Sequence, residues 1–174
     1  MTAPRHGFPR PRHDHAFCMR DALAAADALA RQRGLRFTPL RRHVLEIILG
    51  SHRPMGAYDI LHAMGQARGA RKTAPPTVYR ALDFLLREGF VHRIDTLNAF
   101  VACFEPERGH RAHFLLCRRC GCVAEIEDPA LTGALERAAA AAGFTGERET
   151  VEIVGLCAGC AQKAGATSTA GPSA

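Results

Sequence analysis

Two Cys-x-x-Cys pairs constrain this chain more than any other feature of its sequence. Cys117 and Cys120 form the first pair, Cys157 and Cys160 form the second, and 36 residues lie between the pairs. Each pair can form a tight turn that presents two thiolates to one ion, and two pairs supply the four sulfur ligands of a tetrahedral Zn2+. A compact zinc ribbon needs a shorter spacer. We therefore expect a small folded unit between the two pairs.

A second group of metal-ligand side chains lies on both sides of the first pair. It contains one thiol, two imidazoles and one carboxylate, from Cys103, His92, His110 and Glu125. This donor set suits tetrahedral Zn2+, and the soft sulfur argues against Fe2+ or Mn2+, which favour oxygen ligands. Other roles stay open: His92 alone would also fit a surface histidine, His113 is either a spare ligand or a strand residue, and Cys122 is expected to pack as a small apolar side chain.

The positive charge of the chain is concentrated in its first half. Residues 1–95 carry 16 Lys/Arg against 8 Asp/Glu, whereas residues 96–174 carry 7 against 9. A basic half joined to a mildly acidic half predicts that the first half faces a polyanion and the second does not.

The sequence contains no readable export signal. The N-terminal stretch MTAPRHGFPRPRHDH is basic and Pro-rich without a following apolar segment, and no run approaches the roughly 18 apolar residues of a membrane span. We therefore expect a cytoplasmic protein with reduced thiols. In that setting paired cysteines indicate metal or redox chemistry rather than a disulfide framework.

The basic half has the element order of a winged helix-turn-helix. Thr38-Pro39 predicts a helix start, because Thr can accept from a free N–H group and Pro lacks one. The apolar spacing around it is helical, with Gly residues as stop signals. Four helices are predicted at residues 19–32, 39–49, 57–64 and 75–88, followed by strands at 90–94 and 100–104 around a turn at 95–98.

The fourth predicted helix is the candidate DNA-recognition helix. In a winged helix-turn-helix the N-terminal end of this helix enters the major groove. Its first turn presents Thr77, Tyr79 and Arg80, just after Arg71 and Lys72. Arg80 could pair with guanine through two hydrogen bonds, whereas Arg71 and Lys72 would contact phosphates. Any one of these charges could be a solvated surface residue, but the charge of the half and the helix order together favour DNA.

The second half is predicted to form a β-β-α-β unit. Strands at 114–117 and 122–126 meet at the first cysteine pair, Asp128-Pro129 starts a helix that runs to Gly143, and a strand at 149–156 leads into the second pair. A zinc ion bound by both pairs would join the last strand to the first hairpin. The whole chain is therefore predicted to be α+β.

With these residues in view, the chain resembles the ferric uptake regulator (Fur) family, and within it the zinc-sensing branch. The similarity extends from about Leu23 to Ala161. Its most specific segments are Arg36-Phe-Thr-Pro-Leu-Arg41, Ala57-Tyr-Asp59, Pro75-Pro-Thr-Val-Tyr-Arg-Ala-Leu-Asp-Phe-Leu85, Glu88-Gly-Phe-Val-His92, Cys117-Arg-Arg-Cys-Gly121 and Gly155-Leu-Cys-Ala-Gly-Cys160. The segment before Cys117 lacks the denser His cluster of many iron sensors.

The resemblance implies a zinc-responsive repressor of zinc-uptake genes that binds operator DNA as a homodimer. It implies two Zn2+ per chain, with the paired cysteines as the structural site and His92, Cys103, His110 and Glu125 as the regulatory site. Tyr58 and Arg80 match residues that approach bases. No enzymatic activity, membrane partner or small organic substrate is expected. The implied boundaries are a flexible arm at 1–17, a winged-helix domain at 18–97, a hinge at 98–104, a zinc-binding dimerisation domain at 105–162 and a disordered tail at 163–174.

Three alternatives remain at this point. Within the family, an iron sensor is the nearest one, and Cys103 argues against it. A thiol redox enzyme or peroxide sensor could use Cys-x-x-Cys pairs, but neither pair is predicted at a strand-to-helix junction, where such a thiol is activated. A zinc-ribbon interaction module would need only the four paired cysteines.

The arm residues His13, His15 and Cys18 could form an extra metal site or belong to an unstructured arm.

Overall fold

The computed structural model describes residues 8, 15–66, 73–103, 106 and 111–167. The chain divides into two compact units, an N-terminal unit with described residues from 15 to 106 and a C-terminal unit with described residues from 111 to 167. Each unit has its own three-stranded sheet.

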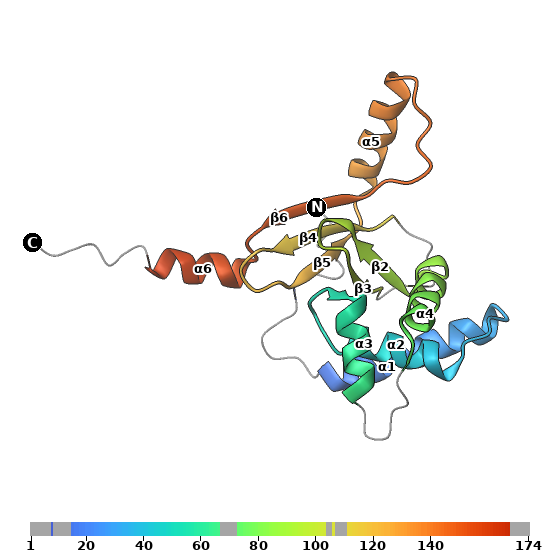
Figure 1. The fold of residues 1–174 in the computed structure, drawn as a ribbon. Helices are drawn as coiled ribbons and strands as arrows, with labels where there is room; N and C mark the ends of the chain where they lie inside the picture. The colour runs from blue at the N-terminus through green and yellow to red at the C-terminus, as the bar shows by residue number, and fades with distance from the viewer. Residues whose placement is uncertain (1–7, 9–14, 67–72, 104–105, 107–110, 168–174) are drawn as a thin grey trace, which may run out of the picture. The chain divides into compact units, whose positions relative to one another are not determined.

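Four helices and a small sheet make up the N-terminal unit (Figure 1). The helices are α1 (His15–Gln32), α2 (Pro39–Leu49), α3 (Ala57–Gln66) and α4 (Pro75–Arg87). The strands are β1 (Met55–Gly56), β2 (Val91–Ile94) and β3 (Ala99–Ala102), which pair antiparallel in the order β1-β3-β2. The predicted winged helix-turn-helix is confirmed, with β2 and β3 as the wing. The two-residue strand β1 and the 3-10 turn η1 (Asp95–Leu97) are additions that the sequence pattern does not predict.

Local sequence explains the start of α2. Thr38 is extended, with φ −73° and ψ 158°, and its side chain accepts a hydrogen bond from the backbone N–H of Arg41 at 3.4 Å. Pro39 follows at the first helical position, where no N–H is needed. The cap that the sequence predicts is therefore present.

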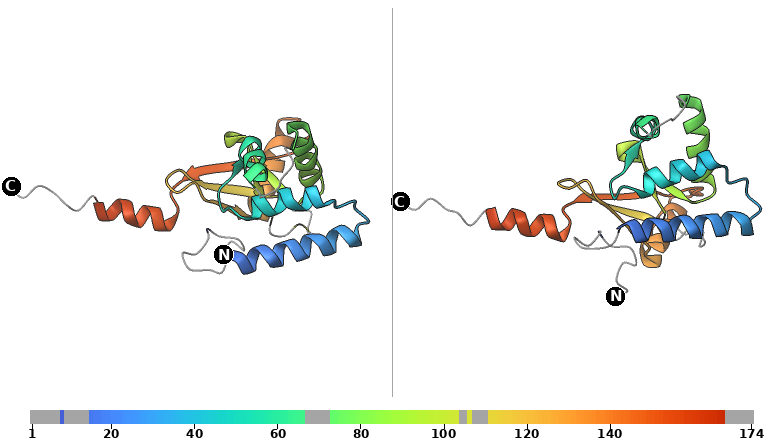
Figure 2. Two further views of the ribbon diagram at one scale, coloured as in Figure 1. Left: turned by 60° about the horizontal axis from the view of Figure 1, so that its bottom comes forward. Right: turned by 90° about the horizontal axis from the view of Figure 1, so that it is seen from below.

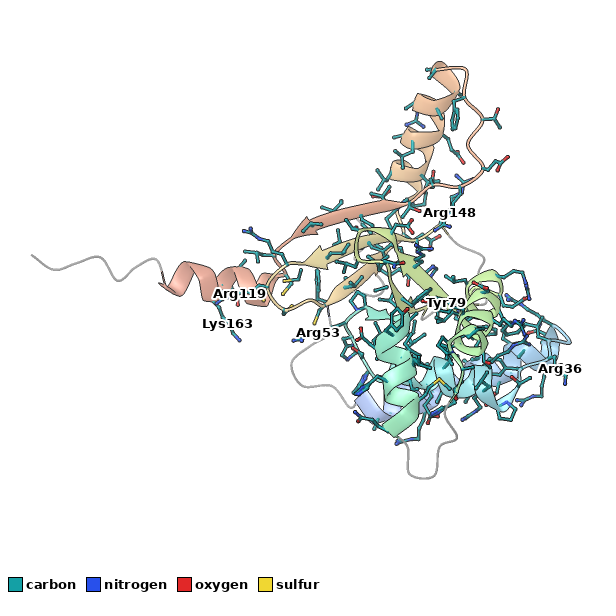
Figure 3. The ribbon with its side chains drawn as sticks, viewed as in Figure 1. Arg36, Arg53, Tyr79, Arg119, Arg148 and Lys163 are labelled. Atoms are coloured by element: carbon teal, nitrogen blue, oxygen red, sulfur yellow. The ribbon has the colours of Figure 1, made fainter. Side chains whose placement is uncertain are left out.

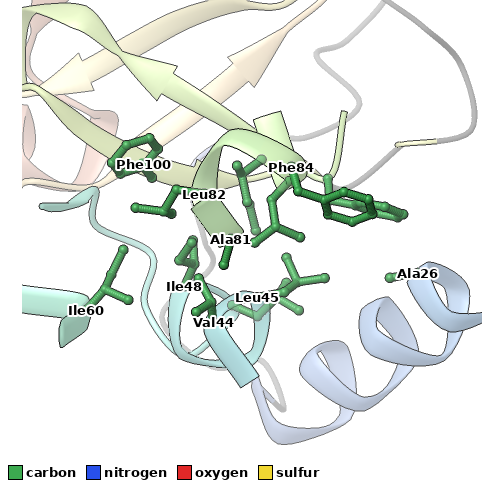
Figure 4. Packing of buried hydrophobic residues seen from close by; sticks show 14 of the residues in the cluster. Ala26, Val44, Leu45, Ile48, Ile60, Ala81, Leu82, Phe84 and Phe100 are labelled. Carbon is green, nitrogen blue, oxygen red and sulfur yellow. The ribbon is translucent and has the colours of Figure 1, made fainter. Parts of the chain in front are cut away.

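A single apolar core holds the N-terminal unit together (Figure 4). Its centre is formed by side chains of α2 and α4 that are at most 2% exposed: Val44, Leu45, Ile48, Val78, Ala81, Leu82 and Leu85. α1 contributes Ala26, α3 contributes Ile60 and β3 contributes Phe100 to the same cluster. Figure 2 shows α1 lying beside α2 in both views. Full burial of one such side chain stabilises the fold by about 1.5–3 kcal/mol, so this core fixes the position of α4.

The C-terminal unit is built on a central strand. β4 (His113–Cys117) pairs antiparallel with β5 (Val123–Ile126) and parallel with β6 (Val151–Gly155). Between β5 and β6 the chain forms α5 (Pro129–Ala141), and α6 (Ala158–Thr167) follows β6. The predicted β-β-α-β order is confirmed. The parallel register places Cys117 opposite Gly155, two residues before the second cysteine pair.

Three details differ from the sequence-based expectations. α1 begins at His15 rather than Met19, so residues 15–17 of the predicted arm belong to a helix. α6 extends to Thr167, into the predicted disordered tail, because its Ala-rich sequence has high helix propensity. Cys157 directly precedes α6, so the second cysteine pair does lie at a strand-to-helix junction.

Candidate metal centre and nucleic-acid interface

The four paired cysteines come together in the C-terminal unit. The Sγ atoms of Cys117, Cys120, Cys157 and Cys160 all lie within 4.8 Å of one another. The Sγ atoms of Cys120 and Cys157 are 3.9 Å apart. Four sulfurs at about 2.3 Å from a tetrahedral zinc are roughly 3.8 Å from each other. The arrangement therefore fits one Zn2+, as the spacing of the pairs predicts.

Backbone hydrogen bonds shape both cysteine turns. The Gly121 N–H donates to the Cys117 carbonyl at 2.8 Å, and Gly121 has a φ of +72°, which favours glycine. In the second turn the Cys160 N–H donates to the Cys157 carbonyl at 2.9 Å. The Arg118 N–H donates to the Gly155 carbonyl at 3.0 Å and so joins β4 to the end of β6. The turns are thus ordered by the backbone itself.

The electrostatics of the cluster favour a bound cation. The Cys157 N–H points at the Cys117 Sγ at 3.4 Å, and this bond, followed by one from Cys120, lowers the pKa of Cys117 to about 6. Burial, together with the neighbouring thiols, raises the pKa of Cys160 to about 12. Four crowded thiols therefore do not all ionise without a positive charge among them. Metal binding releases their protons and removes this conflict.

Two residues of the predicted regulatory group lie close together in the N-terminal unit. His92 is half-buried on β2, and Cys103 is buried directly after β3. The nearest potential ligand atoms of these two side chains lie within 4.8 Å of each other. The Cys103 N–H donates to the Phe90 carbonyl at 3.0 Å, which holds the two strands together at the base of the wing.

The other two residues of that group belong to the second half of the chain. Glu125 is half-buried on β5, where it pairs with Phe114 on β4. His110 lies outside the described residues, as do His13, Arg71 and Lys72.

His113 has a packed position in the C-terminal unit. Its side chain is fully buried, and its Nε2 lies 3.2 Å from the Thr132 Oγ1 on α5. This contact ties α5 to β4 and accounts for a histidine on the strand. Cys122 is half-buried, and its carbonyl accepts a hydrogen bond from the Cys117 N–H at 3.0 Å.

The candidate DNA-binding side chains of α3 and α4 are exposed. Figure 3 labels one of them, Tyr79. Tyr58 at the start of α3 is 74% exposed and Tyr79 in the first turns of α4 is 44% exposed. Thr77 and Arg80 are exposed on the same part of α4, whereas Val78 and Ala81 face the core. Large exposed aromatic rings beside an arginine are suited to contacts with bases.

A basic hollow adjoins the recognition helix and was not singled out by the sequence pattern. It has a volume of about 240 Å³ and is lined by Arg36, Thr38, Leu40, Arg41, Thr77, Arg80 and Ala81. The Arg41 guanidinium stacks on the Phe84 ring at 3.7 Å from its centroid and donates to the Arg36 carbonyl. Three arginines with no acidic residue among the lining side chains attract an anion. One sequence feature could have indicated this hollow. The helices α2 and α4 both begin with Pro, and both have arginines in or next to their first turns.

Comparisons with known proteins agree with this geometry. Residues 32–154 match the model of the ferric uptake regulator family. The chain is 37% identical over 143 residues to the zinc uptake regulation protein of Escherichia coli, covering 82% of each chain. It also resembles two solved structures. One is a zinc uptake regulator complexed with zinc and DNA, with 35% identity, a TM-score of 0.79 and coverage of 84% and 97% of the two chains. The other is holo XcZur, with 42% identity, a TM-score of 0.74 and coverage of 86% and 99%.

Proposed function

The chain belongs to the ferric uptake regulator family, and we propose that it is a zinc-responsive repressor. In this proposal a zinc-loaded homodimer binds operator DNA and represses zinc-uptake genes. The strongest support is the similarity over most of the chain to a zinc uptake regulation protein and to a regulator solved with zinc and DNA. A cytoplasmic location follows from this role.

The four-cysteine cluster is proposed to hold a structural zinc. Its sulfurs lie at distances from one another that suit a tetrahedral ion, and its ligands come from the two ends of the C-terminal unit. Arg119 donates from Nη1 to the Cys160 carbonyl at 3.1 Å, which holds the second turn against the first. A bound zinc would add four coordinate bonds to this unit. They would stabilise a fold whose apolar core is small.

The regulatory zinc is proposed to bind His92, Cys103, His110 and Glu125, giving a second zinc per chain. His92 and Cys103 support this assignment because they lie together at the base of the wing. The wing follows α4 after a single turn, so a change at these side chains would act on the recognition helix through a short, hydrogen-bonded segment. The thiol of Cys103 favours zinc over iron at this position.

The DNA interface is proposed to comprise α4, the start of α3 and the basic hollow. Arg80 would donate two hydrogen bonds to a guanine, while Tyr58, Thr77 and Tyr79 would pack on bases and sugars. Arg71 and Lys72 remain proposed phosphate contacts. Arg36 and Arg41 join them, because the Phe84 ring already orients the Arg41 guanidinium toward the hollow.

The C-terminal unit is proposed to form the dimer. β6 is an edge strand of its sheet, and Ile153 and Val154 on it are 50% and 58% exposed. Phe144, in the connection from α5 to β6, is 67% exposed. An exposed apolar edge strand is a common site of association with another chain. A second copy of the same unit, related by a two-fold axis, would cover it.

Cys103→Ser tests the regulatory assignment directly. The variant should keep one zinc per chain and its melting temperature, but lose the gain in operator affinity on adding zinc, because oxygen replaces the soft ligand. Titration of labelled operator DNA with and without zinc measures this gain. Cys18→Ser, which changes an exposed thiol on α1, is the matched control. A wild-type response of Cys103→Ser would refute the assignment.

A thiol-based peroxide sensor is the second candidate, because Cys157 lies at the strand-to-helix junction before α6. The convergence of all four Sγ atoms favours metal instead, since a redox pair needs only two. Loss of DNA binding with peroxide, and not with a chelator, would favour the peroxide sensor. Iron in the labile site would favour an iron sensor.

A further inference from the structure

Arg33 occupies a fixed position at the end of α1. The Leu35 N–H donates to the Ala30 carbonyl at 2.8 Å, and the Gly34 N–H donates to the Arg31 carbonyl at 3.1 Å. Gly34 has a φ of +64°. These features define a Schellman motif, in which Arg33 is the C-cap residue. The backbone at Arg33 is therefore ordered, and its side chain leaves the helix end in a defined direction.

The recognition helix α4 ends in the same way. The Phe90 N–H donates to the Leu85 carbonyl at 2.8 Å, the Gly89 N–H donates to the Leu86 carbonyl at 3.1 Å, and Gly89 has a φ of +76°. Glu88 is the C-cap, and its carbonyl is one of the helix-end acceptors without an intrahelical donor. Such carbonyls attract cations, because they form the negative end of the helix dipole.

The Arg33 guanidinium bridges this helix end to the segment after the wing. Its Nη1 donates to the Glu88 carbonyl at 3.1 Å, and its Nη2 donates to the Pro106 carbonyl at 3.0 Å. Pro106 lies three residues after Cys103, whose own N–H donates to the Phe90 carbonyl at 3.0 Å. Two hydrogen-bonded links therefore join the C-terminal end of α4 to the chain that leaves β3.

We propose that Arg33 is a positioning residue that couples the metal-sensing segment around Cys103 to the recognition helix. The inference rests on the proposed zinc-responsive function. Zinc binding at Cys103 would restrain the Pro106 carbonyl, which lies three residues further along the chain. The planar guanidinium transmits that position to Glu88, because it holds both acceptors in one rigid fork. The C-terminal end of α4 thereby follows the state of the metal site.

Neighbouring arginines do not share this geometry. Arg31, in the last turn of α1, makes no side-chain hydrogen bond or ion pair to any residue that the structure describes. Arg87 directs its Nε at the Glu88 carboxylate at 3.2 Å, so it contacts the side chain of the C-cap rather than its carbonyl. Arg31 is therefore a control with the same charge on the same helix end.

The test compares Arg33→Lys with Arg31→Lys in the full chain. Both variants keep the net charge, so non-specific attraction to DNA is unchanged, but lysine cannot hold two acceptors in a planar fork. Operator affinity is measured with excess zinc and with a mild chelator that leaves one zinc per chain. The ratio of the two affinities is the coupling. We expect Arg33→Lys to lower this ratio by about 5- to 10-fold, within the usual range of allosteric coupling, and Arg31→Lys to leave it unchanged.

Reciprocity supplies a second readout. The increase in zinc affinity caused by operator DNA should fall by the same factor in Arg33→Lys, because coupling between two sites is mutual. A role in fold stability alone would lower the melting temperature and leave both ratios at the wild-type value, which would overturn the proposal. Equal loss of affinity in both zinc states would also overturn it, because that result describes a plain DNA contact. A wild-type protein without any zinc response would instead refute the proposed function, and the coupling role with it.

Discussion

The two units of this chain bury very different amounts of apolar side chain. The core of the N-terminal unit runs without interruption from α1 through α4 to β3. Among the residues of the C-terminal unit whose burial is described, the buried side chains belong to the sheet and the cysteine cluster: Phe114, Leu116, Cys117, Ala124, Cys160 and His113. None of the residues of α5, all of which are described, is buried. The N-terminal unit is therefore stabilised by its own packing, whereas the proposed zinc and the proposed dimer would supply stability that the small core of the C-terminal unit does not provide.

The largest effect is expected from loss of the proposed structural zinc. Cys157→Ser should strongly destabilise the C-terminal unit without abolishing its folded state, because structural zinc contributes an apparent binding energy of about 10–16 kcal/mol in small zinc-binding peptides. The N-terminal unit should stay folded. Hydrogen exchange, followed separately in the two units, measures the difference. Protection of β4 and β6 that stays at its wild-type level in this zinc-free variant would show that packing holds both units.

A core truncation should affect the other unit. Leu85→Ala removes a fully buried side chain and should destabilise the N-terminal unit by about 2–5 kcal/mol through the cavity that it leaves. Leu97→Ala, at a 54% exposed position on the wing turn, should change stability by less than about 0.5 kcal/mol. Denaturant unfolding measures both. Zinc content should remain at its wild-type value, and a loss of zinc in Leu85→Ala would mean that the units do not fold independently.

Charge placed on the exposed edge of β6 should weaken association. Val154→Asp adds a carboxylate at a 58% exposed apolar position, so sedimentation should show a dimer that dissociates at least about tenfold more readily. Leu97→Asp is the control at an exposed apolar position in the N-terminal unit. An unchanged dimer in Val154→Asp would place the interface elsewhere.

Helix caps offer a smaller comparison between the units. Thr38 caps α2 through the Arg41 N–H, and Asp128 caps α5 through the Ala130 N–H at 2.8 Å. Replacing either cap with Ala should cost about 1 kcal/mol of helix stability. For Thr38→Ala this loss should lower the free energy of global unfolding of the N-terminal unit. In Asp128→Ala it should appear as local fraying of α5, which exchange of α5 amides would detect. An equal loss of global unfolding free energy in Thr38→Ala and Asp128→Ala would contradict this difference between the two units.

The smallest effect concerns protons. The pKa of Cys117 is lowered from 9.0 to about 6. In the metal-free unit its stabilising contribution is therefore present above pH 9 and is lost as the pH falls through about 6. At pH 7 this thiol is already ionised, so zinc binding should release fewer than four protons from the four cysteines. Calorimetry in buffers of different ionisation enthalpy measures the number, and release of four would contradict the lowered pKa.

Sequence patterns predicted the elements well because the apolar periodicity and the caps are local. Thr38-Pro39 and Asp128-Pro129 both start helices as expected, and the cysteine pairs meet as their spacing requires. The Arg33 bridge and the basic hollow were not predictable, since each depends on side chains that meet only in the folded unit. Arg33 and Pro106 are 73 residues apart in the chain. The helix α6 was not predicted, because its composition resembles a linker while its Ala content favours helix.

The proposed zinc response is tested most directly by the metal content of the reduced protein, measured by elemental analysis before and after a mild chelator, with operator binding followed in the same samples. We expect two zincs per chain. The chelator should remove one of them and abolish operator binding, and added zinc should restore both. One zinc throughout, with operator binding that does not respond to the chelator, would contradict the proposed zinc response.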